Sequence, residues 1–189
     1  MLVEVFGSVG VGLLTKSLAL LAFGGDSLIE ISSGVAVLTQ LRLGRGGGAS
    51  DGVGKARTEQ VTGALLFLLI PVIGLGAAYS FLTGLRPEGS PLGVAIAIAA
   101  VVVMPYLYFE KRNIGRETLT PALSIDAIES LTCFFMSVAL VCGLLAEYFL
   151  GLWWADYVAT AAILAFVAKE AIESHHELRR EGKPKEANL

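Results

Sequence analysis

The sequence predicts an all-α polytopic membrane protein with six transmembrane helices, of which the first is short. Two observations support this fold class. Charged residues make up 16% of the 189 residues, whereas an ordinary soluble domain contains about 25%. Residues 61–85 and 89–109 contain no Asp, Glu, Lys or Arg. About 20 consecutive apolar residues are enough for a helix to cross the hydrocarbon core of a bilayer.

Six mainly apolar stretches define the expected helices: 1–15, 17–41, 60–84, 90–109, 121–147 and 153–174. Pro121 is well placed to open the fifth, because proline fits the first helical position. Pro71 and Pro105 fall inside the third and fourth, where membrane helices tolerate proline and bend at it. We expect one transmembrane domain over residues 1–178 and a polar cytoplasmic tail over residues 179–189.

The first stretch is too short for a full crossing. Its 15 residues give about 22 Å of helix, against a hydrocarbon core of about 30 Å. We therefore expect the natural start of the chain to lie upstream of Met1, with local thinning of the bilayer as the alternative. Glu4 in this stretch is expected to make a polar contact inside the bundle.

Basic residues indicate the orientation in the membrane. They concentrate in residues 42–57, 111–116 and 179–185, which we assign to two loops and the tail. In a six-helix alternation these three regions lie on the same side. Because Lys and Arg are enriched on the cytoplasmic side of membrane proteins, both termini should be cytoplasmic.

Three further side chains support predictions of their own. Cys133 and Cys142 are nine residues apart, so at about 100° per residue they point to opposite faces of one helix and cannot pair. Asp156 opens the sixth helix directly after two tryptophans typical of a membrane interface. We interpret it as a charge favoured by the dipole of its own helix rather than as a ligand.

Acidic residues interrupt the second helix near its middle. Asp26 and Glu30 are four residues apart and therefore share one helical face, on which Ser33 also lies. The fifth helix carries a similar stripe, formed by Asp126, Glu129 and Cys133. Both stripes fall near mid-membrane, so one can face the other.

Charged groups at this depth are costly, at about 2.5–3.5 kcal/mol for an Asp at the helix centre on insertion scales. No Lys or Arg is expected at matching depth to neutralise them. Protonation, water or a bound cation must then do so, and each of these indicates an ion pathway. The alternative is that the acids are protonated struts, hydrogen-bonded to neighbouring Ser and Thr.

The combination of motifs resembles the cation diffusion facilitators, a family of proton-coupled exporters of divalent metals. Four segments carry the resemblance. The segment Ser17-Leu18-Ala19-Leu20-Leu21-Ala22 leads into Asp26 and Glu30 on the second helix. The other three are the stripe of the fifth helix, Trp153-Trp154-Ala155-Asp156 and the basic connector 111–116. The family carries Asp-x-x-x-Asp on helix 2 and His-x-x-x-Asp on helix 5. In this chain Glu129 takes the position of that His and Cys133 that of the following Asp.

The resemblance implies a metal site of three carboxylates and one thiol: Asp26, Glu30, Glu129 and Cys133. It gives Asp126 and Ser33 supporting roles, as a proton relay or as hydrogen-bond partners of the ligands. A thiolate favours Zn, Cd or Co over Mg or Ca, so we expect Zn²⁺ first, with Co, Cd and Mn as alternatives. We expect no organic cofactor and no nucleic-acid partner.

The implied function is export of a divalent metal by proton antiport across a bacterial inner (plasma) membrane, not an enzyme activity. Typical members continue into a cytosolic domain that the present sequence lacks, so any homodimer should form through the transmembrane helices. The alternative is a non-transporting module that senses metal or scaffolds a partner. An intramembrane metalloprotease is disfavoured, because the chain has no His-Glu-x-x-His motif.

Overall fold

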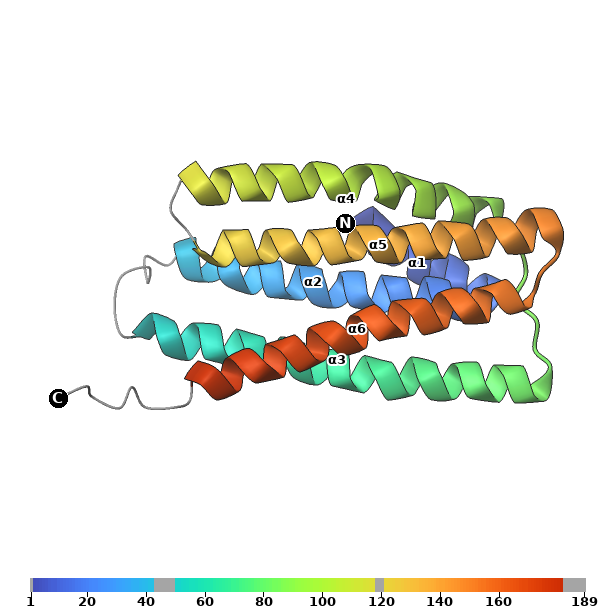
Figure 1. Cartoon of the computed structure of the whole chain (residues 1–189), viewed down its shortest axis with the longest axis horizontal. Coiled ribbons are helices and arrows are strands. Elements are labelled where there is room, and N and C mark those ends of the chain that lie inside the picture. Colours follow the sequence, from blue (N-terminus) through green and yellow to red (C-terminus); the bar gives the residue numbers. More distant parts are fainter. Residues whose placement is uncertain (1, 43–49, 118–120, 182–189) are drawn as a thin grey trace.

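The computed structural model describes residues 2–42, 50–117 and 121–181, without the side chains at 33, 36–42, 50–62, 115, 121–126 and 174–181. The helices are α1 (Leu2–Thr15), α2 (Leu18–Arg42), α3 (Ser50–Thr83), α4 (Pro91–Glu117), α5 (Pro121–Leu150) and α6 (Trp154–Glu181). They lie lengthwise beside one another as a bundle, and no strand occurs in these ranges (Figure 1). The predicted all-α, six-helix fold is therefore confirmed.

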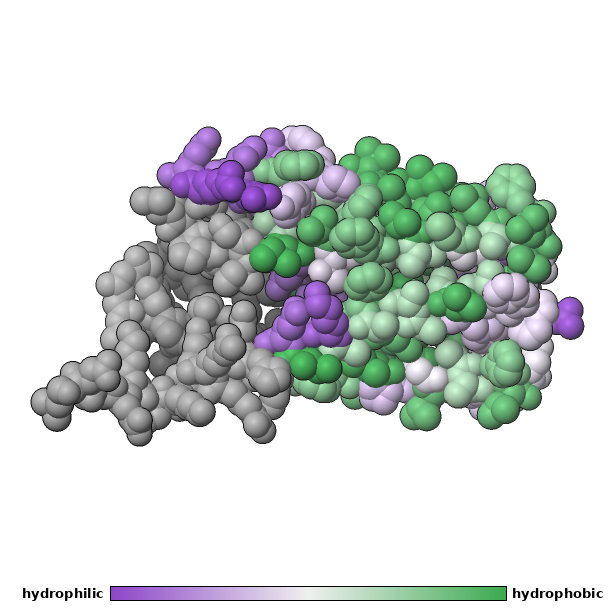
Figure 2. Space-filling view, viewed as in Figure 1, coloured by the Kyte–Doolittle hydropathy of each residue, from purple (hydrophilic) through white to green (hydrophobic). Residues whose placement is uncertain are grey.

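Three described segments are long and apolar enough to cross a membrane: Gly63–Thr83, Pro91–Ile114 and Ala127–Leu150. α1 is a shorter apolar helix, which begins about half-way along the bundle (Figure 1). Apolar side chains cover much of the visible surface, whereas polar ones gather over the end of α4 (Figure 2). These features are those of an integral membrane protein.

Residues with a left-handed backbone end several helices. Lys16 separates α1 from α2 with a φ of 59°. Gly84 follows α3 and Gly151 follows α5, with φ values of 71° and 65°. Glycine adopts this conformation at little steric cost, which suits it to the position just after a helix. Pro121 opens α5, as predicted.

α2 lies at the centre of the bundle, where it packs against α1, α3, α5 and α6. Its segment Ala19–Phe23 includes four fully buried apolar residues, and these join Met136 and Ile163 in the core. Asp26 and Glu30 follow on the next two turns of the same helix. The apolar burial that fixes α2 at the centre therefore also carries both acids into the interior.

α5 and α6 approach each other closely at Gly143. A Cβ added at this position would lie 2.5 Å from the Cβ of Ala159 and 3.2 Å from the carbonyl oxygen of Ala155. Small residues at such crossings let membrane helices pack backbone to backbone. Elsewhere on α5, Cys133 is buried, Cys142 is exposed and both thiols are free, which agrees with their expected places on different faces of the helix.

Candidate metal site

Three of the predicted ligands meet in the centre of the bundle. Asp26 and Glu30 of α2 are 4% and 8% exposed, and Cys133 of α5 is 2% exposed. The Cys133 Sγ lies 3.2 Å from Glu30 Oε2 and 3.5 Å from Asp26 Oδ2, so the thiol can donate to either carboxylate. The acidic face of α2 is thus directed towards the stripe of α5, which brings two carboxylates and a thiol within contact distance.

The remaining predicted residues are placed less directly. Glu129 is half-buried on α5 and interacts electrostatically with Asp26. Ser33 and Asp126 lie outside the described side chains. Among the side chains that the structure describes, no group of three or more His, Cys, Asp and Glu residues has the spacing of a closed metal site. The groups around Cys133 would have to draw together to enclose an ion.

The prediction that no basic residue reaches this depth is wrong. The Lys111 ammonium of α4 lies 2.8 Å from the Ser130 hydroxyl and 3.4 Å from Glu30 Oε1. The Ser130 hydroxyl is in turn 3.4 Å from the same Glu30 oxygen. α4 continues as a helix to Glu117, beyond the predicted end at residue 109. Lys111 therefore stands on a helix packed against α5 rather than in a loop, and its long stem carries the ammonium to the acids.

Two further carboxylates lie around the cluster. Glu4 of α1 and Glu170 of α6 each interact electrostatically with both Asp26 and Glu30. Glu4 was expected only to make a polar contact in the bundle, and Glu170 was not predicted. Glu170 stands between Val167, one turn earlier, and Ala171, which are both fully buried, but the sequence alone does not show that this part of α6 lies near the acids of α2.

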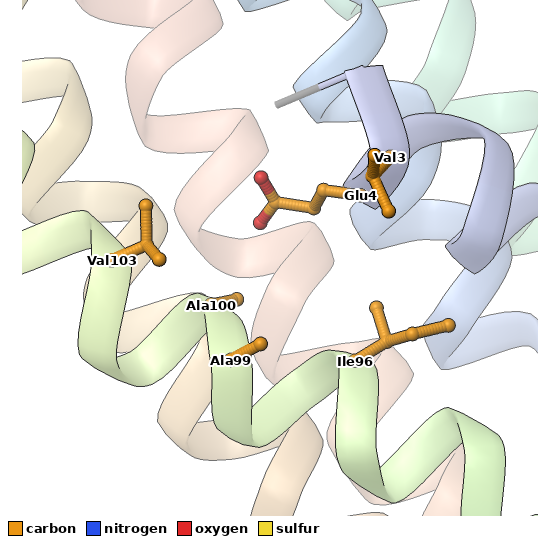
Figure 3. A pocket seen from close by; sticks show the side chains of 6 residues that line it. All are labelled: Val3, Glu4, Ile96, Ala99, Ala100 and Val103. Carbon is orange, nitrogen blue, oxygen red and sulfur yellow. The ribbon is translucent and has the colours of Figure 1, made fainter.

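A cavity of about 170 Å³ lies between α1 and α4. Glu4 from α1 faces α4 across it (Figure 3). Its other lining residues are apolar: Val3, Ile96, Ala99, Ala100 and Val103. Glu4 therefore brings one carboxylate to the edge of an otherwise apolar space.

A second buried acid lies towards the other end of the bundle. Asp156, 1% exposed, accepts hydrogen bonds from the Ser17 hydroxyl at 2.5 Å and the Leu18 backbone N–H at 3.1 Å. The Ser17 hydroxyl also accepts one from the Leu20 N–H at 3.2 Å. Asp156 does lie in the first turn of α6, as predicted. Its contacts, however, cap the start of α2, a structural role that the sequence did not reveal.

The comparison with protein families decides the identity. The family model for the cation efflux transmembrane domain matches residues 2–178, almost the whole chain. The chain belongs to the cation efflux family. A comparison with curated proteins gives no match. Proteins of the cation efflux family are membrane transporters of metal cations and not enzymes, so membership supports metal-cation efflux for this chain. The resemblance seen in the sequence motifs is thereby confirmed.

Proposed function

We propose that this cation efflux protein exports a divalent metal, Zn²⁺ first among them, from the cytoplasm in exchange for protons. Asp26, Glu30, Glu129 and Cys133 bind the ion. The observation that carries the proposal is the burial of two carboxylates and a thiol together in the centre of the bundle, with Cys133 Sγ within 3.5 Å of both acids. Ionisable groups in a membrane interior are costly, and those that occur there typically mark ion pathways.

The donor set favours a borderline metal. Zn²⁺ accepts cysteine and carboxylate ligands in tetrahedral geometry. A thiolate makes the site a poor match for Mg²⁺ or Ca²⁺, which prefer oxygen ligands. Co²⁺, Cd²⁺ and Mn²⁺ remain the competing ions to test.

The same donors supply the coupling to protons. A thiol must lose its proton to bind metal, and carboxylates bind it in their ionised form, so binding releases protons and protonation favours release of the metal. Transport then requires that the site open to one side of the membrane at a time. In secondary transporters this is achieved by rocking of helix groups around a fixed central site.

The orientation follows from the basic residues in 42–57, 111–116 and 179–185. Their excess on one side supports cytoplasmic termini, and we propose the plasma membrane of a bacterial cell as the host membrane. Large apolar side chains exposed on α1, α3 and α4 offer surface for lipid or for a second copy of the chain. A homodimer would therefore form through these helices.

Two observations favour a second candidate function, a non-transporting module that senses metal or scaffolds a partner. The described side chains do not form a closed metal site, and Glu30 already has a positive partner in Lys111. A module of this kind would bind metal saturably without carrying it across the membrane.

Metal flux into proteoliposomes separates the two functions. The purified protein is reconstituted in vesicles that carry a Zn²⁺ indicator and a pH indicator. We expect Zn²⁺ entry with proton counter-flow, and its loss in Asp26→Ala, which should also abolish metal tolerance in an efflux-deficient host. Saturable binding without flux would support the sensor, and unchanged tolerance at normal expression of Asp26→Ala would refute the proposed site.

A further inference from the structure

Lys111 is held at the acidic cluster by two partners from different helices. Its ammonium contacts the carboxylate of Glu30 on α2 and the hydroxyl of Ser130 on α5. The side chain is 19% exposed, whereas that of Glu30 is 6% exposed. Lys111 therefore sits at the rim of the buried cluster, with its charge directed inwards.

The two oxygens of Glu30 have different partners. Oε1 lies 3.4 Å from the Lys111 ammonium, and Oε2 lies 3.2 Å from the Cys133 thiol. If a metal ion were held by Glu30 and Cys133, only the Glu30 carboxylate would separate it from the positive charge of Lys111. Two cations so close repel strongly in an interior of low dielectric constant.

We infer that Lys111 is a tethered counter-cation of the metal site, which neutralises Glu30 and competes with the metal ion for this carboxylate. The inference rests on the proposed metal-transport function. When metal binds Glu30, the ammonium leaves it and swings on its flexible stem towards the exposed end of α4. When metal leaves, the ammonium returns and keeps the buried carboxylate paired, so the energetic cost of an unpaired charge is avoided.

Chemical labelling tests this exchange in the unaltered protein. Purified protein is treated briefly with an amine-reactive reagent at one fixed pH, with and without Zn²⁺, and labelling of each lysine is measured by mass spectrometry. Lys169 is the internal control, because its side chain is more than half exposed and pairs with Glu173 on its own helix. We expect Zn²⁺ to raise labelling of Lys111 several-fold relative to Lys169. Unchanged or lower labelling of Lys111 would overturn the inference.

Zn²⁺ affinities of variants provide the second test. Lys111→Met removes the competing charge and should lower the Zn²⁺ dissociation constant by on the order of tenfold or more. Arg112→Met is the matched control, because it removes the same charge from the next residue, which is exposed and bonded to Tyr108. Equal affinities for these two variants would overturn the inference, since they would indicate a general charge effect.

A third variant separates failure of this inference from failure of the metal site. If Asp26→Asn binds Zn²⁺ as tightly as the unaltered chain, the proposed site is wrong and the inference falls with it. If Asp26→Asn loses binding while Lys111→Met matches Arg112→Met, the site stands and only the role of Lys111 is refuted. The labelling experiment needs no variant, so it decides the question even if Lys111→Met does not fold.

Discussion

The bundle buries carboxylates in two regions, and their partners differ in kind. Asp156 accepts hydrogen bonds from a serine hydroxyl and a backbone N–H at the start of α2. Asp26 and Glu30 face a thiol, and Glu30 also faces an ammonium on a long side chain. The donors to Asp156 stand at a fixed helix terminus, whereas those at the central cluster are side chains that can move away.

This difference indicates which buried acids serve the fold and which serve an ion. A carboxylate capped by an N–H and a hydroxyl is stabilised in one geometry, because the first turn of a helix lacks intrahelical partners for its N–H groups. A carboxylate paired with a lysine can exchange that partner for another cation. We therefore assign Asp156 to structure and the central cluster to transport.

The largest effect should follow from Asp26→Asn. Replacing the carboxylate by an amide removes a charged ligand and keeps its size, so Zn²⁺ flux should fall to the background of protein-free vesicles. Thermal unfolding in detergent should show little loss of stability, because a buried charge has been removed. Flux near that of the unaltered protein would contradict the assignment of this region to transport.

Asp156→Ala should act in the opposite way. It leaves the Ser17 hydroxyl and the Leu18 N–H without their acceptor, and a buried unsatisfied group costs about 1–3 kcal/mol. Because two donors lose their acceptor, the free energy of unfolding should fall by at least this amount in a denaturant titration. The folded fraction should still bind Zn²⁺. A protein of normal stability that has lost Zn²⁺ binding would reverse the comparison between the two regions.

Cys133→Ser should change the choice of metal more than the fold. A hydroxyl is a harder ligand than a thiolate, so affinity for Cd²⁺ should fall about tenfold relative to Mn²⁺. Competition binding among Zn²⁺, Co²⁺, Cd²⁺ and Mn²⁺ measures this shift. Cys142→Ser is the matched control, because it changes an exposed thiol on the same helix and should leave the preference unchanged.

The smallest effect is expected for Lys169→Ala. Lys169 pairs with Glu173 at 3.6 Å, but both side chains are more than half exposed. Exposed pairs of this spacing on a helix contribute about 0.3–0.5 kcal/mol. The free energy of unfolding of the variant should lie within this margin of that of the unaltered protein. A loss above about 1 kcal/mol would show that the ion pair contributes more than a solvated contact.

The sequence predicted the helices and the facing of α2 and α5 well, since both follow from local patterns. Long apolar runs define the spans, and four-residue spacing places Asp26 and Glu30 on one face. Lys111 was misplaced for a physical reason. Charged residues from 110 onwards end the apolar run, but α4 continues to Glu117, because the backbone hydrogen bonds of a helix do not require apolar side chains.

Glu170 was missed for a different reason. Its nearness to the cluster depends on how α6 packs against α2, and packing between helices distant in sequence leaves little trace in one sequence. Asp156 illustrates the same limit. Its place in the first turn of α6 was predicted from its neighbours, whereas its hydrogen bond to Ser17 joins residues 139 positions apart. The local sequence pattern therefore predicts the helix on which a residue lies, whereas its hydrogen-bond partner depends on tertiary packing.

The close approach of α5 and α6 at Gly143 has a mechanical consequence. Cys133 stands ten residues before Gly143 on α5, and Glu170 stands eleven residues after Ala159 on α6. At 1.5 Å per residue, about 15 Å of each helix separates the crossing from the acidic cluster. A rotation of about 10° between α5 and α6 about this crossing would displace Cys133 from Glu170 by about 2.6 Å. That displacement exceeds the length of a Zn–S bond, about 2.3 Å.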